Sequence, residues 1–79
     1  MNAHKNILIQ CGQALYGERW QTDLARDLGL SDGRRIRQWL SDDRPIPEGV
    51  WNDLGKLLAD RKIVINEALI AIHNDLPTK

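Results

Sequence analysis

Residues 20–41 read WQTDLARDLGLSDGRRIRQWLS, and this stretch decides the fold class. Its first apolar residues recur at steps of three and four, which is the spacing of one helix face. They are Trp20, Leu24, Ala25 and Leu28. Gly29 follows them, at the place where a helix commonly ends in a left-handed residue. The stretch therefore predicts a helix over about 20–28 that stops at a glycine turn.

A second helix is predicted over about 32–41. Ser31 or Asp32 can cap it by accepting a backbone N–H. Its inward face is formed by Ile36, Trp39 and Leu40, at steps of three and four residues. Two short helices joined by a glycine turn form a helix-turn-helix.

The flanking residues are also helical in pattern. A first helix is predicted over about Asn2 to Tyr16, ending at Gly17. After the proline-containing connector 42–47, one apolar stripe runs from Val50 to Leu76. It predicts either one long helix to about Asn74 or a break, with Asn66 capping a fifth helix; the β-branched residues at 63–65 favour a break. The predicted fold class is all-α, a four to five helix bundle in one domain spanning 1–79.

Composition excludes several classes of protein. Eleven Lys and Arg balance eleven Asp and Glu, so the net charge is zero, which argues against a histone-like polybasic binder and against an acidic tail protein. One cysteine, Cys11, allows no intrachain disulfide, and with two histidines it offers too few ligands for structural zinc. No apolar run approaches the ~20 residues that span a bilayer. We expect a cytoplasmic protein with no cofactor, no metal and no membrane partner.

The positive charge is concentrated in the second predicted helix. Between Gly33 and Ser41 there are three arginines and no acid. Arginine can bind guanine and glutamine can bind adenine through two hydrogen bonds. The predicted base contacts are Arg34, Arg35, Arg37 and Gln38. The predicted contacts to the DNA backbone are Arg19, Gln21, Thr22, Ser41 and Arg44.

A solvated helix face is the plainer interpretation of such a cluster. Two features favour nucleic-acid binding: the helix follows a glycine turn, and the acids stand at its two ends, with Asp32 before it and Asp42 and Asp43 after it. Asp32 itself is best explained as a helix cap.

Residues 21–31 and 36–40 resemble the helix-turn-helix transcriptional regulators of the phage repressor/Cro-like class. Ala25 matches the small residue where the two helices cross, and Gly29 matches the turn glycine. The segment 44–47 with Trp51 also resembles short bacterial members. The resemblance implies a DNA-binding autoregulator of a phage or other mobile element, such as an anti-CRISPR-associated repressor.

One departure from the family pattern concerns the turn. Ile36 lies seven positions after Gly29, where the family usually has six. We expect Gly33 to absorb the extra residue through its backbone freedom. The register of Arg34 and Arg35 on the DNA stays open.

The C-terminal segment, about 63–76, carries more apolar residues than a small core needs. It either folds back on the first helix or forms a dimer interface. We favour the dimer, because one recognition helix reads only a few base pairs. The predicted interface residues are Ile65, Leu69, Ile72 and Leu76.

The remaining conspicuous residues have structural explanations. The three tryptophans, Trp20, Trp39 and Trp51, are predicted to pack in the core rather than to stack on bases. Cys11 is predicted to be a buried small hydrophobe. Asp23 and Asp27 flank Arg26 and are predicted to form surface salt links with it.

The sequence thus predicts a homodimeric regulator, most plausibly a repressor, that binds double-stranded DNA at a palindromic operator. The alternative is a small helical protein-interaction module, an adaptor or antitoxin-like protein that binds a partner through its apolar C-terminal helix. No arrangement of residues indicates an enzyme.

Overall fold

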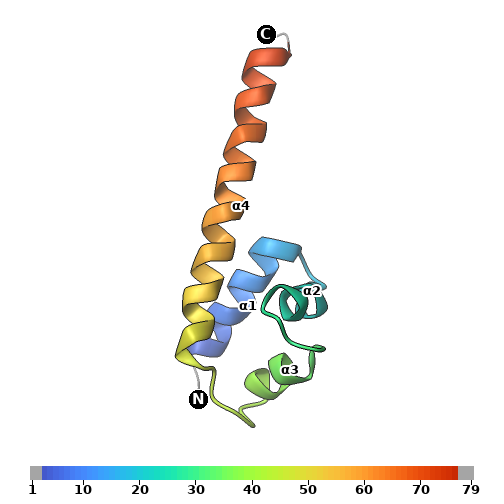
Figure 1. Ribbon diagram of the computed structural model, residues 1–79, viewed down its shortest axis with the longest axis vertical. Helices are drawn as coiled ribbons and strands as arrows, with labels where there is room; N and C mark the ends of the chain where they lie inside the picture. Colours follow the sequence, from blue (N-terminus) through green and yellow to red (C-terminus); the bar gives the residue numbers. More distant parts are fainter. Residues whose placement is uncertain (1–2, 77–79) are drawn as a thin grey trace.

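The computed structural model describes residues 3–76 and consists of four helices (Figure 1). They are α1 (Ala3–Tyr16), α2 (Trp20–Asp27), α3 (Arg34–Leu40) and α4 (Glu48–Asp75). No strand occurs in this part of the chain, so the predicted all-α class is confirmed. The predicted start of the first helix at Asn2 lies outside the described residues.

The core lies where α1, α2, α3 and the first half of α4 meet. α1 packs against both α2 and α4, and α2 packs against α3. Eight apolar side chains are buried there: Leu8, Leu15, Trp20, Leu24, Ala25, Ile36, Trp39 and Leu54. We call this part of the molecule, residues 3–61, the head. Most of the eight come from the three short helices, which therefore hold one another rigidly enough to present a surface.

Two of the three tryptophans are core residues, as predicted. Trp20 and Trp39 are only 3% and 2% exposed. Trp51 is half-buried at the rim instead, where its ring lies edge-on to the His4 ring with 5.9 Å between the centroids. The prediction that Trp51 packs in the core is therefore only partly correct, because Trp51 packs against the core without being buried in it.

The turn after α2 has the geometry that the sequence predicts. Gly29 has φ of 81°, and the Leu30 N–H donates to the Ala25 carbonyl at 2.8 Å. This pair of features closes the helix with a left-handed residue and a long return hydrogen bond. α3 ends in the same way, although its left-handed residue is Asp42, with φ of 66°. The Asp43 N–H there donates to the Gln38 carbonyl at 2.9 Å.

α3 begins two residues later than predicted, at Arg34. The residue at the N-cap position is Gly33, and Asp32, one residue earlier, accepts from the Arg34 N–H at 2.9 Å, so Asp32 satisfies a donor of the first turn as expected without occupying the cap position. Gly33 does not use glycine's special backbone freedom, because its φ is −80°. Our expectation there was wrong. Gly33 is buried, and a Cβ on it would lie 3.1 Å from a guanidinium nitrogen of Arg37, which is the end of a flexible, exposed side chain.

α4 is one uninterrupted helix of 28 residues that ends at Asp75, so of the two alternatives the long helix to about Asn74 is confirmed, and the break at 63–65 with a fifth helix is wrong. β-branched residues cost a helix only a few tenths of a kcal/mol each, roughly, whereas glycine costs about 1 and proline about 3 kcal/mol. No glycine or proline occurs between Lys56 and Leu76. The β-branched run alone is therefore too weak to end the helix.

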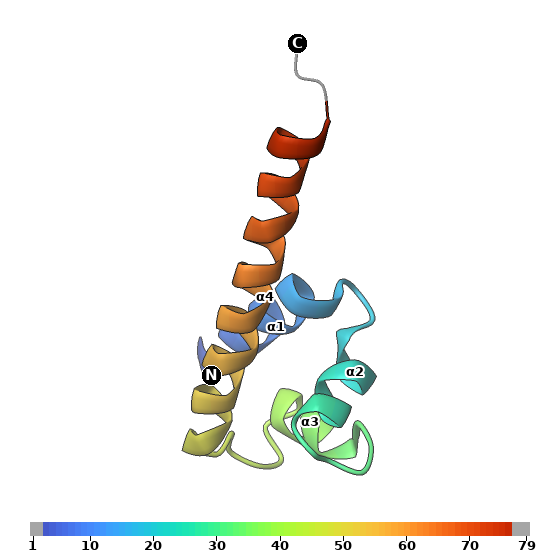
Figure 2. The same cartoon turned by 45° about the horizontal axis from the view of Figure 1, so that its top comes forward.

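The second half of α4 projects away from the head (Figures 1 and 2). Every residue from 59 to 76 is exposed, so the segment does not fold back on α1, and that alternative is wrong. Arg61 marks the last contact: a guanidinium nitrogen donates to the Leu15 carbonyl at 2.8 Å, and the group lies over the Tyr16 ring. None of the helices within residues 3–76 is long and apolar enough to cross a membrane.

Candidate nucleic-acid interface

Three of the four predicted base contacts meet on one flank of α3. Arg34, Arg35 and Gln38 line a hollow of about 240 Å³, together with Arg44 and residues 30–32 of the turn. Both α3 arginines are exposed, and Gln38 is half-buried at the back. Arg44 is included because the left-handed Asp42 reverses the chain, and the Arg44 N–H approaches the Gln38 carbonyl at 3.3 Å.

Arg37 lies on the other flank of α3. It lines a second hollow of about 530 Å³ with Thr22 and Arg26 of α2 and with residues 29–33 of the turn. The structure therefore divides the predicted base contacts into two groups, and it places Arg37 beside a predicted backbone contact, Thr22. At about 100° per residue, Gln38 lies only about 40° around the helix from Arg34, whereas Arg35 and Arg37 lie about 160° apart, on opposite flanks of α3.

The α3 arginines keep their charges available. Within residues 3–76, no ion pair forms at Arg34, Arg35, Arg37 or Arg44. Arg26 of α2 differs, because it lies 3.0 Å from the Asp23 carboxylate and 3.4 Å from that of Asp27. These are the predicted surface salt links. An unpaired guanidinium can still form charge-assisted hydrogen bonds to a phosphate or a base.

Asp32 lies between the two groups of arginines. It lines both hollows, and its carboxylate accepts from the Arg34 N–H. The sequence prediction put the acids beyond the ends of the basic helix and missed this position. The signal was available, because a residue that caps a helix must lie beside its first turn.

The other predicted backbone contacts are more scattered. Arg19 is exposed at the start of α2 and lines neither hollow, and Gln21 is half-buried. The Ser41 hydroxyl lies 3.0 Å from the Asp43 carboxylate and 3.3 Å from the Gln38 carbonyl, so it is already engaged. The structure thus brings Thr22 and Arg44 to the arginine face but not Arg19, Gln21 or Ser41.

The described residues offer little other chemistry. Cys11 is partly buried against the core, and burial raises the pKa of its thiol, which disfavours the nucleophilic thiolate. Residues 3–76 contain no group of three or more His, Cys, Asp or Glu side chains that could hold a metal ion. The four residues predicted at a dimer interface are all exposed on the projecting part of α4.

Compared with known proteins, the chain matches no protein-family model, no curated protein and no solved structure.

Replacing Asp32 by asparagine is expected to raise affinity for duplex DNA several-fold. The amide oxygen of the new side chain can still accept the Arg34 N–H, so the cap is kept, while one negative charge leaves the arginine face. Fluorescence anisotropy with a labelled duplex at low salt measures the change. Asp53→Asn, on the exposed side of α4, is the matched control and should change affinity little. Equal effects of the two substitutions would show that the charge of Asp32 affects DNA binding no more than a charge away from the arginine face.

Proposed function

We propose that this protein is a sequence-specific double-stranded DNA-binding protein that acts as a homodimeric transcriptional repressor. One observation carries the proposal: three arginines that form no ion pair within residues 3–76, together with Gln38, occupy the surface of a helix whose opposite side is anchored in the core. These side chains line two hollows on the flanks of α3, where they can contact a ligand together. The resemblance of residues 21–40 to repressor/Cro-like regulators supports the same function.

The dimensions of α3 suit the major groove. A helix of seven residues is about 10 Å long. The major groove is about 12 Å wide and admits one helix. Ile36 and Trp39 fix the inner side of α3 in the core, so the outer side can enter the groove without rearranging the head.

The two flanks of α3 suggest separate roles. Arg34, Arg35 and Gln38 are the proposed base contacts on one flank, and Arg37 is the proposed base contact on the other. Arg44 and Thr22, at the outer edges of these flanks, are the proposed phosphate contacts. Arg19, Gln21 and Ser41 would add contacts to the DNA backbone only at the rim.

One α3 reads only a few base pairs, so a second copy is needed for a full site. A two-fold dimer would read a palindromic operator, with one recognition helix in each half-site. The interface we propose is the exposed apolar surface of α4 around Leu69, because nothing in the head covers it.

Two substitutions on the same hollow should separate base contacts from phosphate contacts. Gln38→Ala is expected to relax preference at one base pair, at a cost of ~1–3 kcal/mol on the preferred sequence. Arg44→Ala is expected to lower the affinity for all DNA sequences similarly. It should also reduce the salt dependence of binding by the equivalent of about one phosphate contact. Selection of bound duplexes from a random pool, followed by salt titration of the winner and of scrambled DNA, measures both. Absence of duplex binding at low salt would rule out the proposed function.

A second candidate function is a protein-interaction module, an adaptor or antitoxin-like protein. The projecting apolar half of α4 favours it, because such a surface can hold another protein. Charge reversal on α3 discriminates the two functions. An adaptor would keep its partner, whereas a DNA-binding protein would lose its target.

A further inference from the structure

One side of the projecting half of α4 carries a row of apolar residues of the kind by which two helices pair, and we call this row the seam. Ile65, Leu69, Ile72 and Leu76 are 52–57% exposed and follow one another at steps of four, three and four residues. This is the spacing of a coiled-coil seam. Of residues 63–76, only Glu67 and Asp75 are acidic or basic apart from His73. An apolar stripe on a helix normally packs against another element, and in residues 3–76 this one is exposed.

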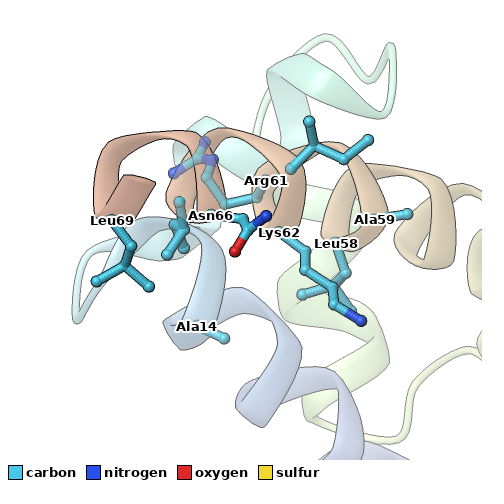
Figure 3. A pocket seen from close by; sticks show the side chains of 9 residues that line it. Ala14, Leu58, Ala59, Arg61, Lys62, Asn66 and Leu69 are labelled. Carbon is cyan, nitrogen blue, oxygen red and sulfur yellow. The ribbon is translucent and has the colours of Figure 1, made fainter. Parts of the chain in front are cut away.

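A pocket lies at the N-terminal end of this seam, where α4 separates from α1. We call this end the root and the C-terminal end of the projecting helix the tip. The pocket has a volume of about 760 Å³, and Figure 3 shows Ala14 of α1 on one side and Leu58, Lys62 and Leu69 of α4 on the other. Ile65 and Leu69 belong both to the pocket and to the seam. The apolar surface is therefore continuous from the pocket to the tip of the helix.

The length of the seam limits how it can be covered. A contact along one side of residues 63–76 follows a helix only about 21 Å long. A partner that reaches the pocket extends the contact to residues 58–76, a helix about 28 Å long, and adds the wall formed by Ala14. A contact that includes the pocket therefore buries more apolar surface than one confined to the tip.

Charge also favours an antiparallel second copy. The root of the projecting helix carries Asp60, Arg61 and Lys62, a net charge of +1, and its tip carries Asp75. An antiparallel pair places Asp75 of each chain near the two cations of the other, whereas a parallel pair sets like charges against like. The helix dipoles also oppose each other favourably in the antiparallel pair.

We infer that a second copy of this chain docks antiparallel on α4, with its tip seated in the pocket at the root. In the register that matches the two seams, Ile65 faces the partner's Leu69 and Leu76 reaches the partner's Leu58. The two heads then lie at opposite ends of a central helix pair. The inference takes from the proposed function only that the chain self-associates, and it holds whether or not the heads bind DNA.

Cysteine crosslinking of the protein without DNA tests the geometry. In a Cys11→Ala background, Lys62→Cys and His73→Cys are prepared as separate proteins, unfolded together, refolded as a mixture and oxidised. Both positions lie on the same side of the seam, and an antiparallel pair brings residue 62 of one chain beside residue 73 of the other. The two copies of residue 62 are then about 15 Å apart, beyond the reach of a disulfide.

We expect a crosslinked dimer from the mixture and none from the Lys62→Cys protein alone. Asn74→Cys in place of His73→Cys is the matched control, since residue 74 lies on the far side of the helix, and it should not crosslink to residue 62. Efficient crosslinking of Lys62→Cys with itself would show a parallel pair and overturn the inference.

The oligomeric state provides a second measurement. Light scattering should give the dimer mass for the wild type and the monomer mass for Leu69→Glu, which lies outside the core and leaves the helical content of the head unchanged. A wild-type monomer at micromolar concentration would overturn the inference. Dimerisation with the expected crosslinks but without DNA binding would contradict the proposed function and would support the antiparallel dimer.

Discussion

The double substitution Arg35→Glu and Arg37→Glu is expected to lower affinity for the preferred duplex by roughly 100-fold or more. Arg35 lies on one flank of α3 and Arg37 on the other, so the change affects both groups of proposed base contacts. Each good contact between arginine and a base contributes about 1–3 kcal/mol of discrimination. The reversed charges also repel the phosphates, so binding to unrelated DNA should fall as well. Anisotropy titrations on both duplexes measure the two losses.

Two further proteins make this result interpretable. Arg35→Lys with Arg37→Lys keeps the charge but cannot form the paired hydrogen bonds, so it should keep binding to unrelated DNA and lose sequence preference. Lys56→Glu reverses an exposed charge on α4, away from α3, and should change affinity little. Because both arginines are exposed, the glutamate variant should keep the helical content and mass of the wild type. Undiminished DNA binding by that variant would contradict a role for α3.

The parts of the fold that the sequence predicts are those fixed by neighbouring residues. The turn at Gly29 follows from an apolar stripe that stops at a glycine, and the structure has the expected left-handed residue there. The turn at Asp42 depends on the same hydrogen-bond pattern but uses a residue that rarely adopts such angles, so the sequence carries no comparable signal. The sequence analysis left the continuity of α4 open, because the β-branched run at 63–65 was weighed against an otherwise unbroken apolar stripe; the absence of glycine and proline after Lys56 already favours the continuous helix.

In the candidate site, too, the features fixed by neighbouring residues could be predicted and those fixed by the three-dimensional fold could not. Its arginines were found because three basic residues without an acid stand out in a short helix. The placement of Arg35 and Arg37 on opposite flanks follows from the helical period, and the position of Asp32 beside the first turn follows from its predicted role as a cap. The two hollows depend on how the turn folds against α2, and that relation leaves no periodic trace in the sequence.

Replacing Gly12 by alanine is expected to destabilise the head by about 1–3 kcal/mol. Gly12 is buried in α1 against the Trp20 indole, and a Cβ on it would come within 2.2 Å of the ring. Trp20 is 3% exposed and cannot move aside without displacing the core. Overpacking of this kind typically costs about 1–3 kcal/mol, and a domain of this size has only about 4–12 kcal/mol of total stability. Urea denaturation followed by tryptophan fluorescence measures the loss.

The matched control for this substitution lies in α4. Gly55 is also inside a helix, but a Cβ on it would meet nothing within 4 Å. Gly55→Ala should therefore stabilise the protein by roughly 0.5–1 kcal/mol, through the higher helix propensity of alanine. Because Gly12→Ala gains the same propensity term, the difference between the two variants isolates the clash with Trp20. Equal stability changes in the two proteins would mean that α1 and α2 do not approach as closely as this core requires.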